Sequence, residues 1–257
     1  MAIACATLTP QGGLQVPFRH HRTVDRVVAI CEAVARDGRG LTLGDLADRL
    51  QAPKSSIQEL TNGLLATGYL VEEQKKFFLG PAPFVLTLMS NPVAARAIEH
   101  DDLIRLSKKM GTTVLVAIQV GDTYVHLDQV GESAGPAVLH GVRIRQRRPL
   151  LETASGKIIL ANLAPQELDH ALLTAARSGP DAIDRFMTEL PEIRRSGVAF
   201  NYGATVADAY AAATGIYDRQ GRFVAAVSII VGPERADELP ALGKRLLDEA
   251  RALKQSR

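Results

Sequence analysis

The chain has 257 residues, enough for two domains of ordinary size, and its 46% hydrophobic and 23% charged residues exclude a disordered protein. A formal net charge of +2 excludes nucleic-acid recognition by bulk charge alone, so an argument for DNA binding has to come from local pattern. No run approaches the roughly 18 apolar residues of a membrane-spanning helix. The two cysteines, Cys5 and Cys31, suit neither a disulfide framework nor a metal site. We therefore expect a cytoplasmic protein.

The N-terminal third predicts a flexible arm over residues 1–20, followed by three short helices. Apolar residues recur at steps of three and four over 23–36. Thr42 is a typical N-cap, with Asp45 at the position of a capping-box carboxylate. Pro53 suits the first turn of a third helix. We expect the second and third helices, separated by only a few residues, to form a helix-turn-helix.

The next residues, YLVEEQKKFFLG, have apolar flanks and a polar centre, a pattern typical of a β-hairpin. Three helices and a hairpin predict a winged helix-turn-helix over residues 21–82. Prolines then bracket a short apolar connector, and a helix is expected from Val93 to Met110. We assign residues 83–111 to this connector and linker helix.

From residue 112 to residue 257 the pattern predicts a second domain. Strands TTVLVAIQV and TYVHLDQV are joined at Gly121-Asp122, and AVLHGVRIR continues the β character. Helices and strands follow, and a final helix closes the chain. The fold class is therefore α+β, with an antiparallel sheet and helices packed on it, similar to GAF or PAS sensor domains. The expected helices are 155–161, 165–176, 181–196 and 233–254, and the expected returning strands are 209–217 and 223–231.

The polar face of the third helix carries residue types that bind DNA. Gln and Asn pair with adenine, Glu accepts from cytosine, and Lys and Ser bind phosphates. An ordinary solvated helix face has similar residues, so the hairpin and helix spacing carry the argument. Residues 1–83 hold nine Arg or Lys against eight Asp or Glu, so non-specific attraction is expected to be modest. The DNA-contact candidates are Arg22, Arg26, Lys54, Ser55, Ser56, Gln58, Glu59, Asn62, Lys75 and Lys76, with Arg19 as a further cation facing the backbone.

In the second domain, Arg143, Arg145 and Arg147 alternate, so on a strand they would share one face. They could bind a carboxylate, or simply form a solvated or inter-subunit face. Ser155 opens a helix, where it could help to bind an anion or act only as a cap.

Three stretches resemble the IclR family of bacterial regulators, in the family order. The first runs from TVDRVVAICEAV to LTLGDLADRLQAPKSSIQELTNGLLATGYL, the second is RRPLLETASGKIILANL, and the third comprises IRRSGVAF and GIYDRQGRFVAAVSIIVGP. Two departures stand out. Glu59 occupies a position where the family usually has Arg, and Arg145 occupies one where Gly is usual.

The resemblance implies a homodimer, or a dimer of dimers, that binds double-stranded operator DNA and a small-molecule effector. Across the family this effector is frequently a carboxylate or an aromatic catabolite. The resemblance implies neither a cofactor nor a metal. It maps the effector site onto Ala154, Ser155, Asn201, Tyr202, Ala211, Ala213, Ser228 and Ile230, the residues from 201 to 213 lying along one returning strand. Leu139 and Arg145 complete the effector-site candidates.

An alternative from another class is a small-molecule-binding or enzymatic domain whose N-terminal head serves only for dimerisation. Glu59 and the nearly neutral head favour it. Against it, the chain has no phosphate loop, no G-x-S-x-G motif and no two-histidine zinc motif. We therefore expect a non-enzymatic regulator, either a repressor or an activator.

Overall fold

A computed structural model describes residues 20–89, 98–131, 134–143, 145–174 and 180–255. The chain divides into two compact units, Met1–Asn91 and Pro92–Arg257. Arg19 lies outside the described residues.

Three helices pack together in the first unit through the apolar residues that the periodicity predicted. Ile30, Leu46 and Ile57, one from each helix, are fully buried at the centre of this core. The predicted capping box is confirmed: Thr42 Oγ1 accepts from the Asp45 amide at 3.2 Å, and the Asp45 carboxylate accepts from the Thr42 amide at 2.9 Å. The helices are α1 (Arg22–Asp37), α2 (Leu43–Arg49) and α3 (Lys54–Ala66).

The predicted hairpin follows as β1 (Leu70–Glu73) and β2 (Lys76–Leu79), which pair antiparallel. Gln74 and Lys75 form its two-residue turn, and both have positive φ, as a tight turn between twisted strands requires. Leu41 pairs with Phe77 as an isolated bridge, which joins the loop before α2 to the hairpin. The three helices and the hairpin confirm the winged helix-turn-helix.

The expected connector is partly a helix. Residues Ala82–Met89 form α4, which bears no charged side chain and buries none of its residues in the first unit. Phe84, Leu88 and Met89 are each more than three-fifths exposed. The linker helix expected from Val93 begins, in the described residues, only at His100, as α5 (His100–Met110). Residues 93–97 lie outside the described residues.

The second unit is built on a six-stranded antiparallel sheet in the order β5-β4-β3-β8-β7-β6. β3 and β4 are joined at Gly121-Asp122, as predicted, and β7 and β8 are the predicted returning strands. The edge strand β6 pairs with β7, so the residues expected along one returning strand lie on two neighbouring strands. The strands are β3 (Thr113–Val120), β4 (Thr123–Val130), β5 (Arg148–Pro149), β6 (Val198–Tyr202), β7 (Tyr210–Tyr217) and β8 (Phe223–Val231).

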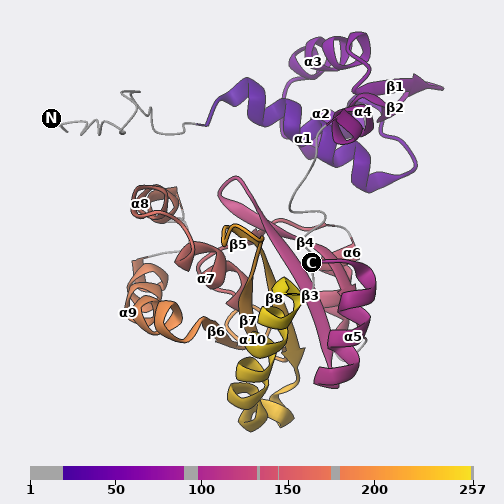
Figure 1. Cartoon of the computed structure of the whole chain (residues 1–257). Helices are drawn as coiled ribbons and strands as arrows, with labels where there is room; N and C mark the ends of the chain where they lie inside the picture. The colour runs from indigo at the N-terminus through magenta and orange to yellow at the C-terminus, as the bar shows by residue number, and fades with distance from the viewer. Residues whose placement is uncertain (1–19, 90–97, 132–133, 144, 175–179, 256–257) are drawn as a thin grey trace, which may run out of the picture. The chain divides into compact units, whose positions relative to one another are not determined.

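Helices cover both faces of this sheet, because side chains along each strand alternate between two apolar clusters (Figure 1). On β8, Val227 and Ile229 face α5 and α10, whereas Ala226 faces α7 and α9. The remaining elements are α6 (Pro136–Arg143), α7 (Ala154–Ala161), α8 (Pro165–Thr174), α9 (Pro180–Ser196), a 3-10 helix η3 (Pro233–Glu238) and α10 (Leu239–Gln255).

The prediction of a strand through AVLHGVRIR is wrong, because residues 137–143 of this segment belong to α6. Val138 and Val142 are buried beside Leu115 and Ile230 of the sheet, whereas His140 between them is exposed. On a strand all three would share one face, so the burial follows helical spacing. Arg143 ends the helix, so the alternating arginines do not share a strand face.

Candidate functional site

The exposed face of α3 presents a set of polar side chains opposite its buried face. Gln58 donates from Nε2 to Asn62 Oδ1 at 2.8 Å, so the two amides form a joined pair one helical turn apart. Glu59 lies beside this pair and is also exposed. Lys54 and Ser55, in the first turn of the helix, are exposed as well.

Two of the DNA-contact candidates are bonded to each other within the unit. Arg26 of α1 donates to Ser56 Oγ of α3 at 3.1 Å, and both residues are partly buried. This hydrogen bond joins the first helix to the third. Arg22, at the start of α1, remains exposed, as do Lys75 and Lys76 at the tip of the hairpin.

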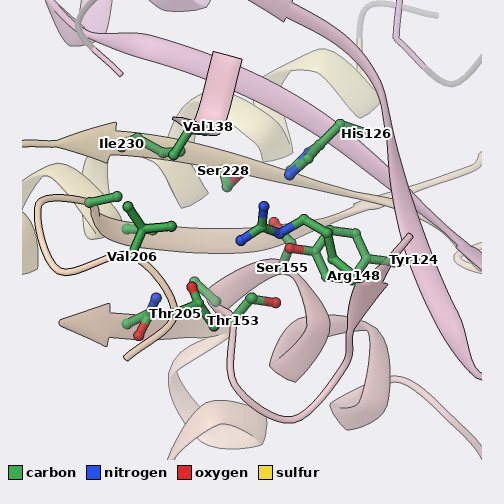
Figure 2. Close-up of a pocket in the computed structure, with 14 residues that line it drawn as sticks. Tyr124, His126, Val138, Arg148, Thr153, Ser155, Thr205, Val206, Ser228 and Ile230 are labelled. Atoms are coloured by element: carbon green, nitrogen blue, oxygen red, sulfur yellow. The ribbon is translucent and has the colours of Figure 1, made fainter. Parts of the chain in front are cut away.

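The second unit contains a small cavity of about 40 Å³, enough for a few water-sized groups (Figure 2). It lies between β4, the start of α7 and the strands β7 and β8, with α6 and the segment after β6 completing its wall. Its lining residues are Tyr124, His126, Val138, Arg148, Thr153, Ala154, Ser155, Asn201, Thr205, Val206, Ala209, Ala211, Ser228 and Ile230.

The N-terminus of α7 forms one wall of the cavity. Thr153 is its N-cap and accepts from the Gly156 amide at 3.1 Å. The amides of Ala154 and Ser155 precede the first intrahelical hydrogen bond, so the helix itself offers them no acceptor. Amides at a helix N-terminus favour an anion. Gly156 is required here because a Cβ would lie 2.1 Å from the carbonyl oxygen of Leu150.

Arg148 contributes a positive charge to the same cavity. Figure 2 shows its guanidinium extending into the centre of the space, near Tyr124 and Ser155. No ion pair joins Arg148 to a carboxylate within the described part of the chain. Burial raises the pKa of the Tyr124 hydroxyl, while hydrogen bonds to Thr153 and Arg148 act in the opposite direction.

His126 is the buried titratable group of the cavity wall. Burial lowers the pKa of its imidazole to about 3, and the charges of Arg148 and Arg145 contribute in the same direction. The ring is therefore neutral near pH 7. It stacks edge-to-face on Tyr124, with ring centroids 5.3 Å apart. Arg145 donates to the carbonyl oxygen of His126 at 3.3 Å.

The structure brings six of the ten effector-site candidates together at this cavity: Ala154, Ser155, Asn201, Ala211, Ser228 and Ile230. The other four lie elsewhere. Leu139 packs beside the cluster of α6 and the sheet, Ala213 is buried in the main core, and Tyr202 is half exposed. Arg145 is exposed in the loop after α6.

Sequence reasoning missed five polar residues of the wall: Tyr124, His126, Arg148, Thr153 and Thr205. A signal was present for two of them, because Tyr124 and His126 occupy alternate positions of a predicted strand and so had to share a face. Arg148 directly follows Arg147, and the sequence does not distinguish the two. In the structure Arg148 belongs to β5, pairs with Tyr124 of β4 and lines the cavity.

Two family models match the two units. The model "Bacterial transcriptional regulator IclR C-terminal" matches residues 88–255, and "IclR helix-turn-helix domain" matches residues 23–74. The chain belongs to the IclR family. It is a DNA-binding transcription regulator with a C-terminal effector-binding domain, so the family and the α+β fold expected from the sequence are confirmed.

Other IclR-type proteins agree with this assignment. The HTH-type transcriptional regulator TtgV of Pseudomonas putida is 29% identical over 197 residues, covering 73% of this chain and 71% of TtgV. KdgR of Escherichia coli is 24% identical over 220 residues, covering 80% of this chain and 81% of KdgR. A solved IclR homologue from Microbacterium hydrocarbonoxydans, complexed with 4-hydroxybenzoate, has a TM-score of 0.70 at 20% identity and covers 91% of this chain and 98% of its own.

These comparisons favour a ligand-responsive regulator over the alternative of an enzyme with a dimerisation head. Within the described residues, no group of three or more His, Cys, Asp or Glu side chains could hold a metal ion. None of the described helices is both long and apolar enough to cross a membrane.

Proposed function

We propose that this IclR-family chain is a cytoplasmic, non-enzymatic regulator whose effector is a small organic acid bound in the cavity. The observation that carries the proposal is Arg148, a guanidinium without a carboxylate partner in the described residues that extends into a partly apolar cavity. A carboxylate there would receive charge-assisted hydrogen bonds from Arg148 and from the amides that open α7.

The lining of the cavity indicates the kind of acid. Val138, Val206 and Ile230 provide an apolar wall, which suits a short carbon chain. The titration below includes benzoate, because the family resemblance also allows aromatic acids. The complex of 4-hydroxybenzoate with a homologue supports a carboxylate in general.

On the DNA side, we propose that the amide pair of Gln58 and Asn62 contacts base edges while Lys54, Ser55 and the wing lysines contact phosphates. Arg22 adds a phosphate contact. Ser56 and Arg26 act by fixing α1 against α3, as their hydrogen bond supports. The apolar α4, with Phe84, Leu88 and Met89 exposed, supports a homodimer in which a second copy covers this helix.

Calorimetry on the purified full chain tests the effector. Acetate, propionate, butyrate and benzoate are titrated into the wild type and Arg148→Gln, and glycerol and glucose serve as neutral probes. We expect at least one small acid to bind the wild type and to lose most of its affinity in Arg148→Gln. Binding confined to the neutral probes would overturn the assignment.

Regulation is tested by gel shift on the DNA that flanks this protein's own gene, with and without the acid that binds. An effector coupled to DNA binding changes operator affinity by about 5- to 150-fold. An operator affinity that the bound acid leaves unchanged would show that the cavity ligand is not the effector.

A further inference from the structure

His126 has an unusual environment for a buried polar group. Its side chain is 6% exposed, and its Nδ1 atom has no hydrogen-bond partner in the described structure. Buried nitrogen and oxygen atoms in proteins almost always have a partner, because leaving one without a partner is costly. The atom lies on a residue that lines the cavity, so a ligand in the cavity can supply the missing partner.

The neighbours of His126 determine what that partner can be. Burial and the charges of Arg148 and Arg145 disfavour an imidazolium, whereas a hydrogen bond to the Val116 backbone acts in the opposite direction. No carboxylate of the described residues pairs with the ring. A neutral imidazole has one nitrogen that donates and one that accepts. A ligand hydroxyl can accept from Nδ1 or donate to it, so it fits either tautomer. A methylene group in the same place can do neither.

Arg148 and His126 act on the same space. Figure 2 shows the guanidinium of Arg148 extending into the centre of the cavity. The nitrogen atoms of His126 point toward the same space (Figure 2). A ligand whose carboxylate binds Arg148 and the start of α7 therefore has its neighbouring carbons near the imidazole. A substituent on those carbons is what His126 would contact.

We infer that His126 is a specificity-determining residue that selects hydroxy acids over the corresponding unsubstituted acids, through a hydrogen bond between Nδ1 and the ligand hydroxyl. This inference rests on the proposed function, because it requires an organic acid bound at Arg148. A site built to hydrogen-bond a hydroxyl discriminates strongly against the analogue without it, since the buried protein atom then remains unpaired.

Paired ligands test the inference by calorimetry on the full chain: glycolate against acetate, and each enantiomer of lactate against propionate. We expect the wild type to prefer a hydroxy acid by at least about tenfold, equivalent to about 1.4 kcal/mol. His126→Phe, which keeps a ring but no nitrogen, should bind propionate while losing this preference. His126→Gln, which restores an amide donor and acceptor, should recover part of it.

The control is His140→Phe, which changes an exposed histidine of α6 and should keep the wild-type preference. Thermal unfolding of each variant verifies that it is folded, and His126→Gln retains the test if the phenylalanine variant does not fold. Equal affinity for paired acids in the wild type, together with loss of both in Arg148→Gln, would overturn the inference and leave the proposed function intact. Binding of neither acid would overturn both.

Discussion

Gln58 and Asn62 are joined by a hydrogen bond of 2.8 Å across one turn of the exposed face of α3. The opposite face of the helix holds Ile57, Thr61 and Leu64 in the core, so α3 cannot rotate the amides away without exposing apolar side chains. The hydrogen bond limits the rotamers of both amides before DNA is bound. Two fixed amides on a recognition helix suit adenine, whose N6 and N7 atoms an amide pairs with.

Gln58→Ala should therefore weaken binding to the operator more than binding to random DNA. We expect a loss of about 1–3 kcal/mol for the specific site and little change in the salt dependence, because no phosphate contact is removed. Gel-shift titrations at two salt concentrations measure both quantities. Gln166→Ala, which removes an exposed amide from α8, is the matched control. A uniform loss on operator and random DNA would show that Gln58 does not read bases.

Glu59→Gln should strengthen binding to DNA of any sequence at low salt. Glu59 is exposed on the same helix face as the amide pair, where its charge would repel the phosphates of bound DNA. The gain should be a few-fold and should diminish as salt screens the charge. Asp169→Asn in the second unit removes the same charge far along the chain and should have no such effect. Weaker operator binding in Glu59→Gln would instead indicate that the carboxylate accepts from a cytosine.

The wing lysines should contribute to the salt dependence and not to sequence preference. Lys75 and Lys76 are exposed at the tip of the hairpin, where they can reach a phosphate backbone. Replacing both by Gln should reduce the slope of log affinity against log salt by about one for each lost phosphate contact. Titrations on operator and random DNA should show the same reduction. An unchanged slope would place the wing away from the DNA.

Local signals made the first unit predictable. Thr42 and Asp45 specify a helix start within four residues, and the polar centre of the hairpin specifies a turn, so neither depends on distant contacts. Arg143 shows the opposite case. In the short run AVLHGVRIR, periods of 2 and 3.6 fit almost equally well. In the structure Val138, Gly141 and Val142 are buried while His140 is exposed, and only the helical period explains that pattern.

The cavity was harder to predict because its wall comes from segments far apart in the sequence. At position 145 the chain departs from the family, and only the structure explains why Arg is tolerated there. Arg145 has a φ of 51°, in the left-handed region that favours glycine, which accounts for the Gly usual there in the family. Its guanidinium donates to the carbonyl oxygens of His126 and Val142, and these bonds hold the loop in place without a glycine.

Gly156→Ala should destabilise the second unit. The added Cβ would lie 2.1 Å from the backbone oxygen of Leu150, and backbone cannot move aside as a flexible side chain can. We expect a decrease of about 1–3 kcal/mol in the free energy of unfolding, measured by urea denaturation. Gly135→Ala is the control, because a Cβ at that position meets nothing within 4 Å. Equal stability of the two variants would mean that the loop before α7 adjusts freely.

His126 should make the stability of the unliganded protein depend on pH. Its pKa is lowered to about 3 in the folded chain by burial and by two arginines, against about 6.5 in the unfolded chain. Between these values the unfolded state binds a proton that the folded state does not. The free energy of unfolding should therefore fall as the pH decreases below 6.5, and this group should account for up to about 1.4 kcal/mol for each pH unit. Above pH 6.5 the imidazole is neutral in both states, so it adds no pH dependence.

The variant His126→Gln lacks this titration but keeps the carboxylates and the other histidines, so their contributions cancel in the comparison. Urea denaturation at pH 7 and pH 5 should show the wild type losing about 2 kcal/mol more than the variant over this interval. His140→Gln, which changes an exposed histidine, should follow the wild type. An equal decrease in the free energy of unfolding in the wild type and in His126→Gln would mean that His126 accepts a proton in the folded state without penalty. The conclusion that His126 is neutral in the cavity would then be wrong.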